Sequence, residues 1–275
     1  MSSLFLLAAL GAAVGFGIGD FIGGRASAKI PVVQVLVIGE IFGAVVFGLI
    51  AVLNQEAWLP TQLLWLALLA GISGALGLAA LYHGIAQGHT AITAPVSAAL
   101  SALVPVGYGL IIHGLPSTLA VSGMVVGIVA ITLNSLSGRA QGYQGLWQGL
   151  SAGLAIGIFL ILLKFVADAG VFMPLAVIRA SALVITIPWL LWRPGGRPNA
   201  LGFGFAILAG AFDLSANAAY MVATQLGRID IASVLASLYP AITVLLAAFI
   251  NREHITALQR WGLITTLIAT ALIAL

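Results

Sequence analysis

Three charged residues lie deep within long apolar stretches of the sequence: Glu40, Arg179 and Asp213. A helix rises about 1.5 Å per residue, so Glu40 and Asp213 would lie roughly 14 Å and 18 Å from one membrane face, and Arg179 roughly 12 Å from the other. In an apolar layer about 30 Å thick, all three fall near one plane. An ionisable side chain at that depth is costly unless it is paired or hydrated, which makes each of them a functional candidate.

The sequence leaves two interpretations of these charges open. Arg179 and Asp213 reach almost the same level on consecutive helices, so they can form a bidentate pair that only offsets its own desolvation. Alternatively, Asp213 or Glu40 loses its partner, binds a proton or a cationic group, and so links cavity occupancy to helix rearrangement. Glu40 has no obvious partner unless it shares Arg179. An apolar setting favours its neutral form, which either carries protons or bonds a backbone carbonyl in a structural role.

The helix that carries Asp213 has two more polar residues at helical spacing. Asn217 and Tyr220 follow Asp213 at four and seven residues, so Asp, Asn and Tyr share one helix face. We expect this polar stripe to line a cavity rather than to face lipid.

The ninth apolar stretch contains a proline that breaks its hydrogen-bonding pattern. Tyr239 would lie roughly 13 Å deep, immediately before Pro240. Because Pro240 cannot donate a backbone hydrogen bond, a kink is expected there. With Ser237 nearby, the kink either presents polar groups to a cavity or is a packing feature in which Tyr239 bonds a neighbouring helix.

The other charged residues have simpler explanations. Lys164 and Asp168 are spaced i,i+4 near a helix end and are expected to form an interfacial pair. Asp20 and Arg25 are interpreted in the same way. The four histidines fall at predicted helix ends, where solvated imidazoles are expected, and a proton-relay role for His83 is the alternative.

The composition places all of these residues in a lipid environment. Of 275 residues, 62% are hydrophobic and 6% are charged, and the mean hydropathy is +1.19. A water-soluble domain could not bury so much apolar surface. The ten Lys and Arg residues form no basic cluster, which excludes nucleic-acid binding as the main role. Because there is no cysteine and the histidines lack ligand spacing, no cofactor and no metal are expected.

Ten apolar runs are long enough to cross a bilayer, which predicts an all-α polytopic membrane protein of ten transmembrane helices. Ala26-Ser27-Ala28 resembles a signal-peptide cleavage site, but the chain start carries no positive charge and the first run is long, so the first span is expected to remain. The predicted spans are Leu4–Ile22, Pro31–Leu53, Gln62–Tyr82, Ile92–Ile112, Leu119–Leu136, Leu146–Val166, Val171–Trp192, Leu201–Val222, Ile231–Ile250 and Ile255–Leu275.

Basic residues are distributed unevenly among the predicted loops. The even-numbered loops offer only Arg228, with Lys164 just inside a helix end. The odd-numbered loops hold Arg25, Lys29, Arg139, Arg193, Arg197, Arg252 and Arg260. Because Lys and Arg concentrate on the cytoplasmic side, both termini are predicted to lie outside a cell membrane, the inner membrane in a bacterium.

The two halves of the chain resemble each other. Glycines recur every fourth residue from Gly11 to Gly23 and again from Gly145 to Gly157, and Leu103-Val104-Pro105 matches Leu238-Tyr239-Pro240. This predicts a first five-helix repeat over residues 1–137 and a second over 143–275. Since five spans is an odd number, the second repeat would be inverted, as in secondary transporters. The glycines have a plainer explanation as close helix packing, which is compatible with sliding.

The segment Ser233-Val234-Leu235-Ala236-Ser237-Leu238-Tyr239-Pro240-Ala241, followed by Glu253 and Gly262, resembles the EamA-like family of the drug/metabolite transporter superfamily. The first helix and its exit, residues 19–27, are similar to one branch of that family. The resemblance implies a ten-helix exporter or permease of small metabolites with a central cavity. Two features depart from the family: Gly114 stands where the second half has Glu253, and many members are expected to have cytoplasmic termini.

These observations predict a secondary transporter, expected to export a small organic metabolite such as an amino acid or a cationic or amphoteric solute. Alternating access with proton antiport is preferred, and an uncoupled permease or a channel is the alternative. No enzymatic activity is expected, because nucleotide-binding, hydrolase and metalloprotease motifs are missing. The expected partners are the solute, the bilayer and protons. A monomer would suffice for a cavity, and a dimer is compatible with it.

Overall fold

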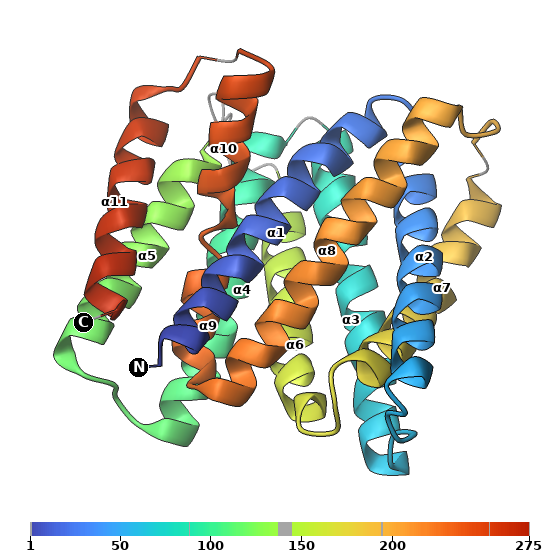
Figure 1. The fold of residues 1–275 in the computed structure, drawn as a ribbon. Helices are drawn as coiled ribbons and strands as arrows, with labels where there is room; N and C mark the ends of the chain where they lie inside the picture. Colours follow the sequence, from blue (N-terminus) through green and yellow to red (C-terminus); the bar gives the residue numbers. More distant parts are fainter. Residues whose placement is uncertain (1, 88, 137–144, 194, 253, 275) are drawn as a thin grey trace.

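A computed structural model describes residues 2–87, 89–136, 145–193, 195–252 and 254–274, and these residues form an all-helical bundle (Figure 1). Arg139 and Glu253, on which parts of the sequence interpretation rest, lie outside the described residues. The helices are α1 (Ser3–Ser27), α2 (Val32–Leu53), α3 (Thr61–Ala86), α4 (Thr90–His113), α5 (Thr118–Ser135), α6 (Leu146–Ala167), α7 (Phe172–Trp192), α8 (Ala200–Leu226), α9 (Ile229–Ala236), α10 (Tyr239–Ile250) and α11 (Ala257–Ala274).

The ten predicted spans are confirmed by helices that are long and apolar enough to cross a membrane, with α9 and α10 together forming the ninth span. Several helices start at polar caps that the sequence supplies. The Ser2 hydroxyl accepts from Phe5 N at 3.2 Å, and Asn199 Oδ1 accepts from Gly202 N at 2.7 Å. Such side chains satisfy backbone donors that the first turn leaves unpaired.

The two ends of the bundle are distinguished by the loops that they carry. The odd-loop face carries the connections α1–α2, α3–α4, α5–α6, α7–α8 and α10–α11, at the top of Figure 1. The even-loop face carries the connections α2–α3, α4–α5, α6–α7 and α8–α9. The chain therefore begins and ends toward the even-loop face (Figure 1).

The helices pair reciprocally between the two halves of the chain. α1 packs along α8 and α6 packs along α3, while α2 pairs with α7 and α5 pairs with α11. α1 also contacts α9 and α10, as α6 contacts α4. Two related five-helix halves of opposite direction would give such pairings, so the inverted repeat stays a prediction that the arrangement accommodates.

The glycine stripes lie at close helix contacts. A Cβ on Gly153 would come within 2.8 Å of Ser97 O, and one on Gly15 would come within 3.1 Å of Phe212 O. Gly149 and Gly157 are crowded in the same way by Val96 and Val104 of α4. At Gly11, by contrast, a Cβ would meet no atom within 4 Å. The packing explanation therefore holds for most of these glycines, because small residues let helices approach in lipid.

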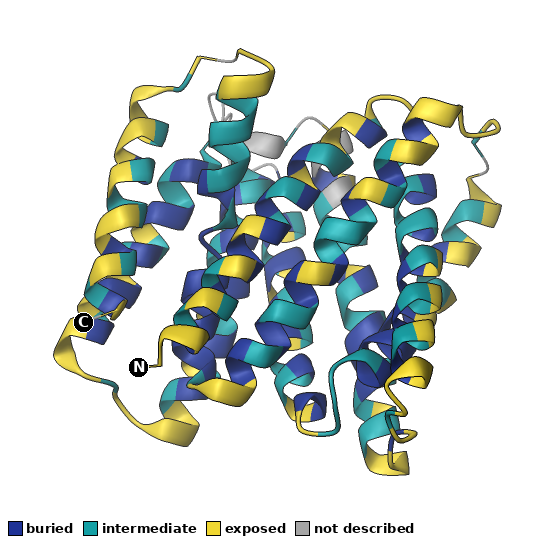
Figure 2. Cartoon of the chain, in the orientation of Figure 1, coloured by how far each residue is buried: buried dark blue, intermediate teal, exposed yellow. Residues whose placement is uncertain are grey.

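Large apolar side chains cover the outer surface of the bundle, where Figure 2 shows many exposed residues along α11, α2 and the outer side of α1. Five exposed tryptophans stand near helix ends: Trp58, Trp65, Trp147, Trp192 and Trp261. This is the distribution expected when lipid is the solvent and aromatic rings sit at the membrane interfaces.

We expect Gly153→Ala to destabilise the protein by about 1–3 kcal/mol, because the added methyl group overpacks the contact between α6 and α4. Gly11→Ala is the matched control, since the same change at the other stripe enters open space. Thermal unfolding of both variants in detergent measures the difference. An equal melting temperature for the two variants would contradict the packing role of Gly153.

Candidate functional site

A cavity of about 770 Å³ lies between the halves of the helices that are nearer the odd-loop face. Ser27, Ala28 and Val32 line it at the turn between α1 and α2, and Leu160 and Arg179 line it near the middle of the bundle. The cavity therefore runs from the odd-loop face to the level of the buried charges. Its walls are mostly apolar.

Arg179 is held between two carboxylates. Its Nη1 donates to Glu40 Oε1 at 3.3 Å and Oε2 at 3.4 Å, and its Nη2 donates to Asp213 Oδ2 at 2.5 Å. The predicted pair of Arg179 with Asp213 is confirmed, but through one hydrogen bond rather than a bidentate contact, because Glu40 shares the same guanidinium. Three helices, α2, α7 and α8, are thus joined at one point inside the membrane.

Small residues make room for the triad formed by Glu40, Arg179 and Asp213. A Cβ on Gly43 would come within 3.1 Å of the Arg179 Cγ, so the glycine lets the arginine stem pass along α2. Gly210 of α8 approaches Gly39 of α2 closely enough that a Cβ on Gly210 would lie 3.2 Å from the Gly39 Cα. These two close approaches place Glu40 where α7 and α8 both reach it.

The three charges differ in access to the cavity. Glu40 and Arg179 are buried, at 6% and 8% exposed, whereas 40% of the Asp213 side chain is exposed. Asp213 is therefore the member of the triad that a solute in the cavity meets most directly. Glu40 is more buried than Asp213 and bonds Arg179 rather than standing alone in an apolar setting.

Asp20 is a site residue that the sequence interpretation missed. It lines the cavity and is exposed to it, and its charge interacts with that of Asp213. The expected interfacial pair with Arg25 is wrong: the Arg25 guanidinium lies over the rings of Phe21 and Phe205, 5.8 Å and 5.6 Å from their centroids. The span was predicted to end at residue 22, but α1 continues to residue 27 and carries Asp20 about 10 Å inside it.

Asn217 lines the cavity one helical turn beyond Asp213, as predicted. Its Nδ2 donates to the Asp213 backbone carbonyl at 2.7 Å, and its Oδ1 has no hydrogen-bond partner among the described residues.

Tyr220 does not line the cavity, which corrects the expected stripe of three residues. Its ring is fully buried, and its hydroxyl pairs with Ser233 Oγ at 2.8 Å and donates to Leu160 O at 3.4 Å. The cavity ends before the helix reaches Tyr220.

The ninth span is interrupted rather than only kinked. α9 ends at Ala236, α10 begins at Tyr239, and both Ser237 and Tyr239 line the cavity. The Tyr239 ring packs edge-on against Phe16, with 6.3 Å between the ring centroids. The break is stabilised from α1, because Thr243 Oγ1 donates to Gly17 O at 3.1 Å. The break therefore presents polar side chains to the cavity and also packs against α1, so both alternatives considered for the proline hold.

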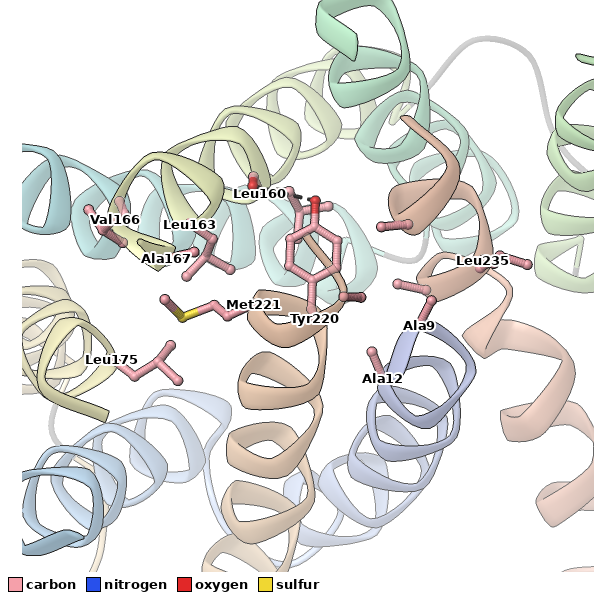
Figure 3. Close-up of a cluster of buried hydrophobic side chains, with 14 of the residues drawn as sticks. Ala9, Ala12, Leu160, Leu163, Val166, Ala167, Leu175, Tyr220, Met221 and Leu235 are labelled. Carbon is pink, nitrogen blue, oxygen red and sulfur yellow. Dashed lines mark hydrogen bonds between the residues drawn. The ribbon is translucent and has the colours of Figure 1, made fainter. Parts of the chain in front are cut away.

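Beyond the cavity, the halves of the helices nearer the even-loop face pack into an apolar seal. Its members labelled in Figure 3 come from α1, α6, α7, α8 and α9, and they converge around Tyr220 and Met221. The labelled residues are Ala9, Ala12, Leu160, Leu163, Val166, Ala167, Leu175, Tyr220, Met221 and Leu235. All except Leu160 are 0% exposed, so these side chains close the structure on this side.

Polar contacts hold the loops of the sealed side together. Glu56 Oε2 accepts from Phe172 N at 3.1 Å and Met173 N at 2.7 Å at the start of α7. Arg228 pairs with the buried Asp230 at 2.7 Å and donates to the carbonyl of Gly114 at the end of α4. The predicted interfacial pair of Lys164 and Asp168 is also confirmed, at 3.8 Å.

Within the described residues, ten helices long and apolar enough to cross a membrane surround a charged cavity, and they indicate a multi-pass membrane protein. Residues 144–275 match the model of the EamA-like transporter family, a family of the drug/metabolite transporter superfamily. The resemblance seen in the sequence is thereby confirmed over the second half of the chain, which is similar to the membrane transporters of this family.

Comparison with solved structures supports the fold. The crystal structure of another protein superposes with a TM-score of 0.81, and the match covers 99% of this chain and 96% of the other. Its sequence is 14% identical, so the likeness concerns the fold alone. The chain matches none of the curated proteins.

We expect Arg179→Gln to destabilise the protein by about 3–5 kcal/mol, because it leaves buried Glu40 and half-buried Asp213 without a counter-charge. The double variant Arg179→Gln with Glu40→Gln should recover most of this loss. Arg193→Gln, an exposed arginine near the end of α7, is the control. Unfolding in detergent reports the stabilities, and a normal melting temperature for Arg179→Gln would contradict the assigned role of the triad.

Proposed function

We propose that the protein is a secondary transporter that moves a small organic solute by alternating access. The observation that carries the proposal is the cavity that reaches from the odd-loop face to Arg179 and is closed beyond that point by packed side chains. A carrier needs such a one-sided site, whereas an open channel needs a continuous path. The alternative of an uncoupled permease shares this geometry.

The inverted repeat supplies the second state of the cycle. If residues 1–137 and 143–275 are related halves, exchanging their conformations would close the odd-loop face and open the even-loop face. The reciprocal helix pairings support this relation. The closely packed glycine contacts of α1 and α6 are smooth surfaces on which the halves can move.

Arg179 offers a simple means of coupling. It bonds Glu40 and Asp213 together, so a proton or cation that binds one carboxylate leaves the guanidinium to the other. Neutralising one of the two carboxylates weakens its ion pair with Arg179 and so weakens the link among α2, α7 and α8. Proton antiport through Glu40 and Asp213 is therefore the preferred coupling.

The loop charges set the direction. Arg25, Lys29, Arg193 and Arg197 belong to the odd-loop face, and the positive-inside rule places that face in the cytoplasm of a cell membrane. The cavity would then open to the cytoplasm with both termini outside. A solute that enters the cavity from the cytoplasm would be released outside, so this orientation supports export.

We expect Leu36→Cys, in the cavity wall one turn before Glu40, to react with a membrane-impermeant maleimide in inside-out vesicles and not in intact cells. Arg197→Cys in the α7–α8 loop should give the same pattern, and Ala223→Cys in the buried part of α8 should stay unlabelled in both. The chain has no native cysteine, so background labelling is absent. Labelling of Arg197→Cys only in intact cells would reverse the proposed orientation.

We expect Glu40→Gln to abolish solute uptake driven by a proton gradient while sparing counterflow exchange, because it removes a titratable group without closing the cavity. A solute is first chosen by its ability to raise the melting temperature of the detergent-solubilised protein. Flux of that solute is then measured in proteoliposomes. Unchanged proton dependence would remove Glu40 from the mechanism.

The exposed Asp168 provides the control for this experiment, because Asp168→Asn removes a carboxylate outside the cavity. It should leave both gradient-driven uptake and counterflow unchanged. Failure of the wild-type protein to move any stabilising solute in either assay would overturn the proposed transport function.

A further inference from the structure

We infer that the cavity binds its solute through a protonated amine and that Asp20 is the counter-ion of this amine. The inference rests on the proposed function and specifies the chemical class of its solute: an organic ammonium ion with an apolar body and no carboxylate.

Asp20 is the carboxylate of the cavity that is free to take a new partner. Glu40 and Asp213 are both occupied by Arg179. Among the described residues, no cation lies within ion-pair distance of Asp20, and Arg25, five residues later, is held over two aromatic rings. A carboxylate in this position, exposed to the cavity and surrounded by apolar walls, gains most from a cation that enters the cavity.

The charge balance of the walls favours the same sign. Asp20, Glu40 and Asp213 line the cavity against the single guanidinium of Arg179, which leaves an excess of two negative charges when all are ionised. Arg179 already donates to both of its neighbours, so a carboxylate on the solute would have to displace one of them. An ammonium group instead offsets the excess.

One hydrogen-bond acceptor of the cavity wall, one helical turn from Asp213, also lacks a donor among the described residues. Asn217 is 1% exposed, belongs to the cavity wall, and its Oδ1 has no donor among the described residues. A buried acceptor without a donor is energetically costly, and a ligand N–H can recover that cost. Nearby, Pro240 has no N–H to offer to the Ala236 carbonyl at the C-terminal, negative end of α9. The Asn217 oxygen lacks a donor, and a primary ammonium supplies three.

The remaining wall suits an apolar body. Phe16, Phe159 and Tyr239 line the cavity together with many aliphatic residues. Phe16 and Tyr239 adjoin the break between α9 and α10, and Phe16 is one turn from Asp20 on α1. Aromatic faces attract cations as well as apolar groups, so they favour an ammonium ion carrying a ring or alkyl chain.

The inference is tested with four probes of one shape and different charge. They are 2-phenylethylamine, 2-phenylethanol, phenylacetate and phenylalanine, which present a cation, a neutral hydroxyl, an anion and a zwitterion. Binding to the purified full-length protein in detergent is measured at neutral pH by thermal shift and by calorimetric titration. We expect the amine to bind at least about tenfold more tightly than each of the others.

Three variants locate the binding site. Asp20→Asn should weaken amine binding by about tenfold or more, and Asp20→Glu should retain most of it because it keeps the charge. Asp168→Asn, which removes an exposed carboxylate outside the cavity, should bind as the wild type does. Asp20 is exposed to the cavity, so its substitution is expected to leave the melting temperature without probe unchanged, which separates a binding defect from a folding defect.

Several results would overturn the inference: equal or tighter binding of phenylacetate or phenylalanine, amine binding that is unaffected in Asp20→Asn, or no binding of the amine by a folded wild type. Amine binding that depends on Asp20 but is not followed by flux in proteoliposomes would uphold this inference and contradict the proposed transport function. Flux of another solute that does not depend on Asp20 would uphold the proposed transport function and contradict this inference.

Discussion

The architecture depends on the cost of placing an arginine inside a membrane. A guanidinium cannot give up its charge in a protein, so Arg179 must be neutralised wherever α7 positions it. Glu40 and Asp213 do this from two other helices, and the glycines at positions 39, 43 and 210 let those helices come close enough. The central crossing of α2, α7 and α8 is therefore fixed by electrostatics, while the surrounding helices are held by packing.

The same requirement explains why the cavity and the seal are divided at this level. On one side of Arg179 the walls include ionised groups, which need water or a polar solute nearby. On the other side alanine, leucine and valine pack without space, and the Tyr220 hydroxyl is satisfied internally by Ser233 and Leu160. A dry region and a wet region thus meet at the triad.

Much of this arrangement could be predicted from the sequence, because lipid imposes a simple rule. Spans of about twenty apolar residues must be helices, which is why the ten spans and the depth of Glu40, Arg179 and Asp213 could be estimated by counting. Contacts between distant helices could not. The sharing of Arg179 by two acids, and the place of Tyr220 in the seal, depend on which helices are neighbours. Asp20 was misjudged because apolar content does not mark where α1 ends.

The contact between Glu56 and the first turn of α7 has a mechanical implication. This carboxylate extends from the α2–α3 loop and holds two backbone N–H groups of the helix that carries Arg179. The helix that carries Arg179 is therefore anchored to a surface loop at its N-terminal end, on the side away from the cavity mouth. A tilt of α7 that moves its N-terminal end away from the α2–α3 loop would break these two hydrogen bonds. Their strength therefore adds to the energy needed to move Arg179 at the centre of the membrane.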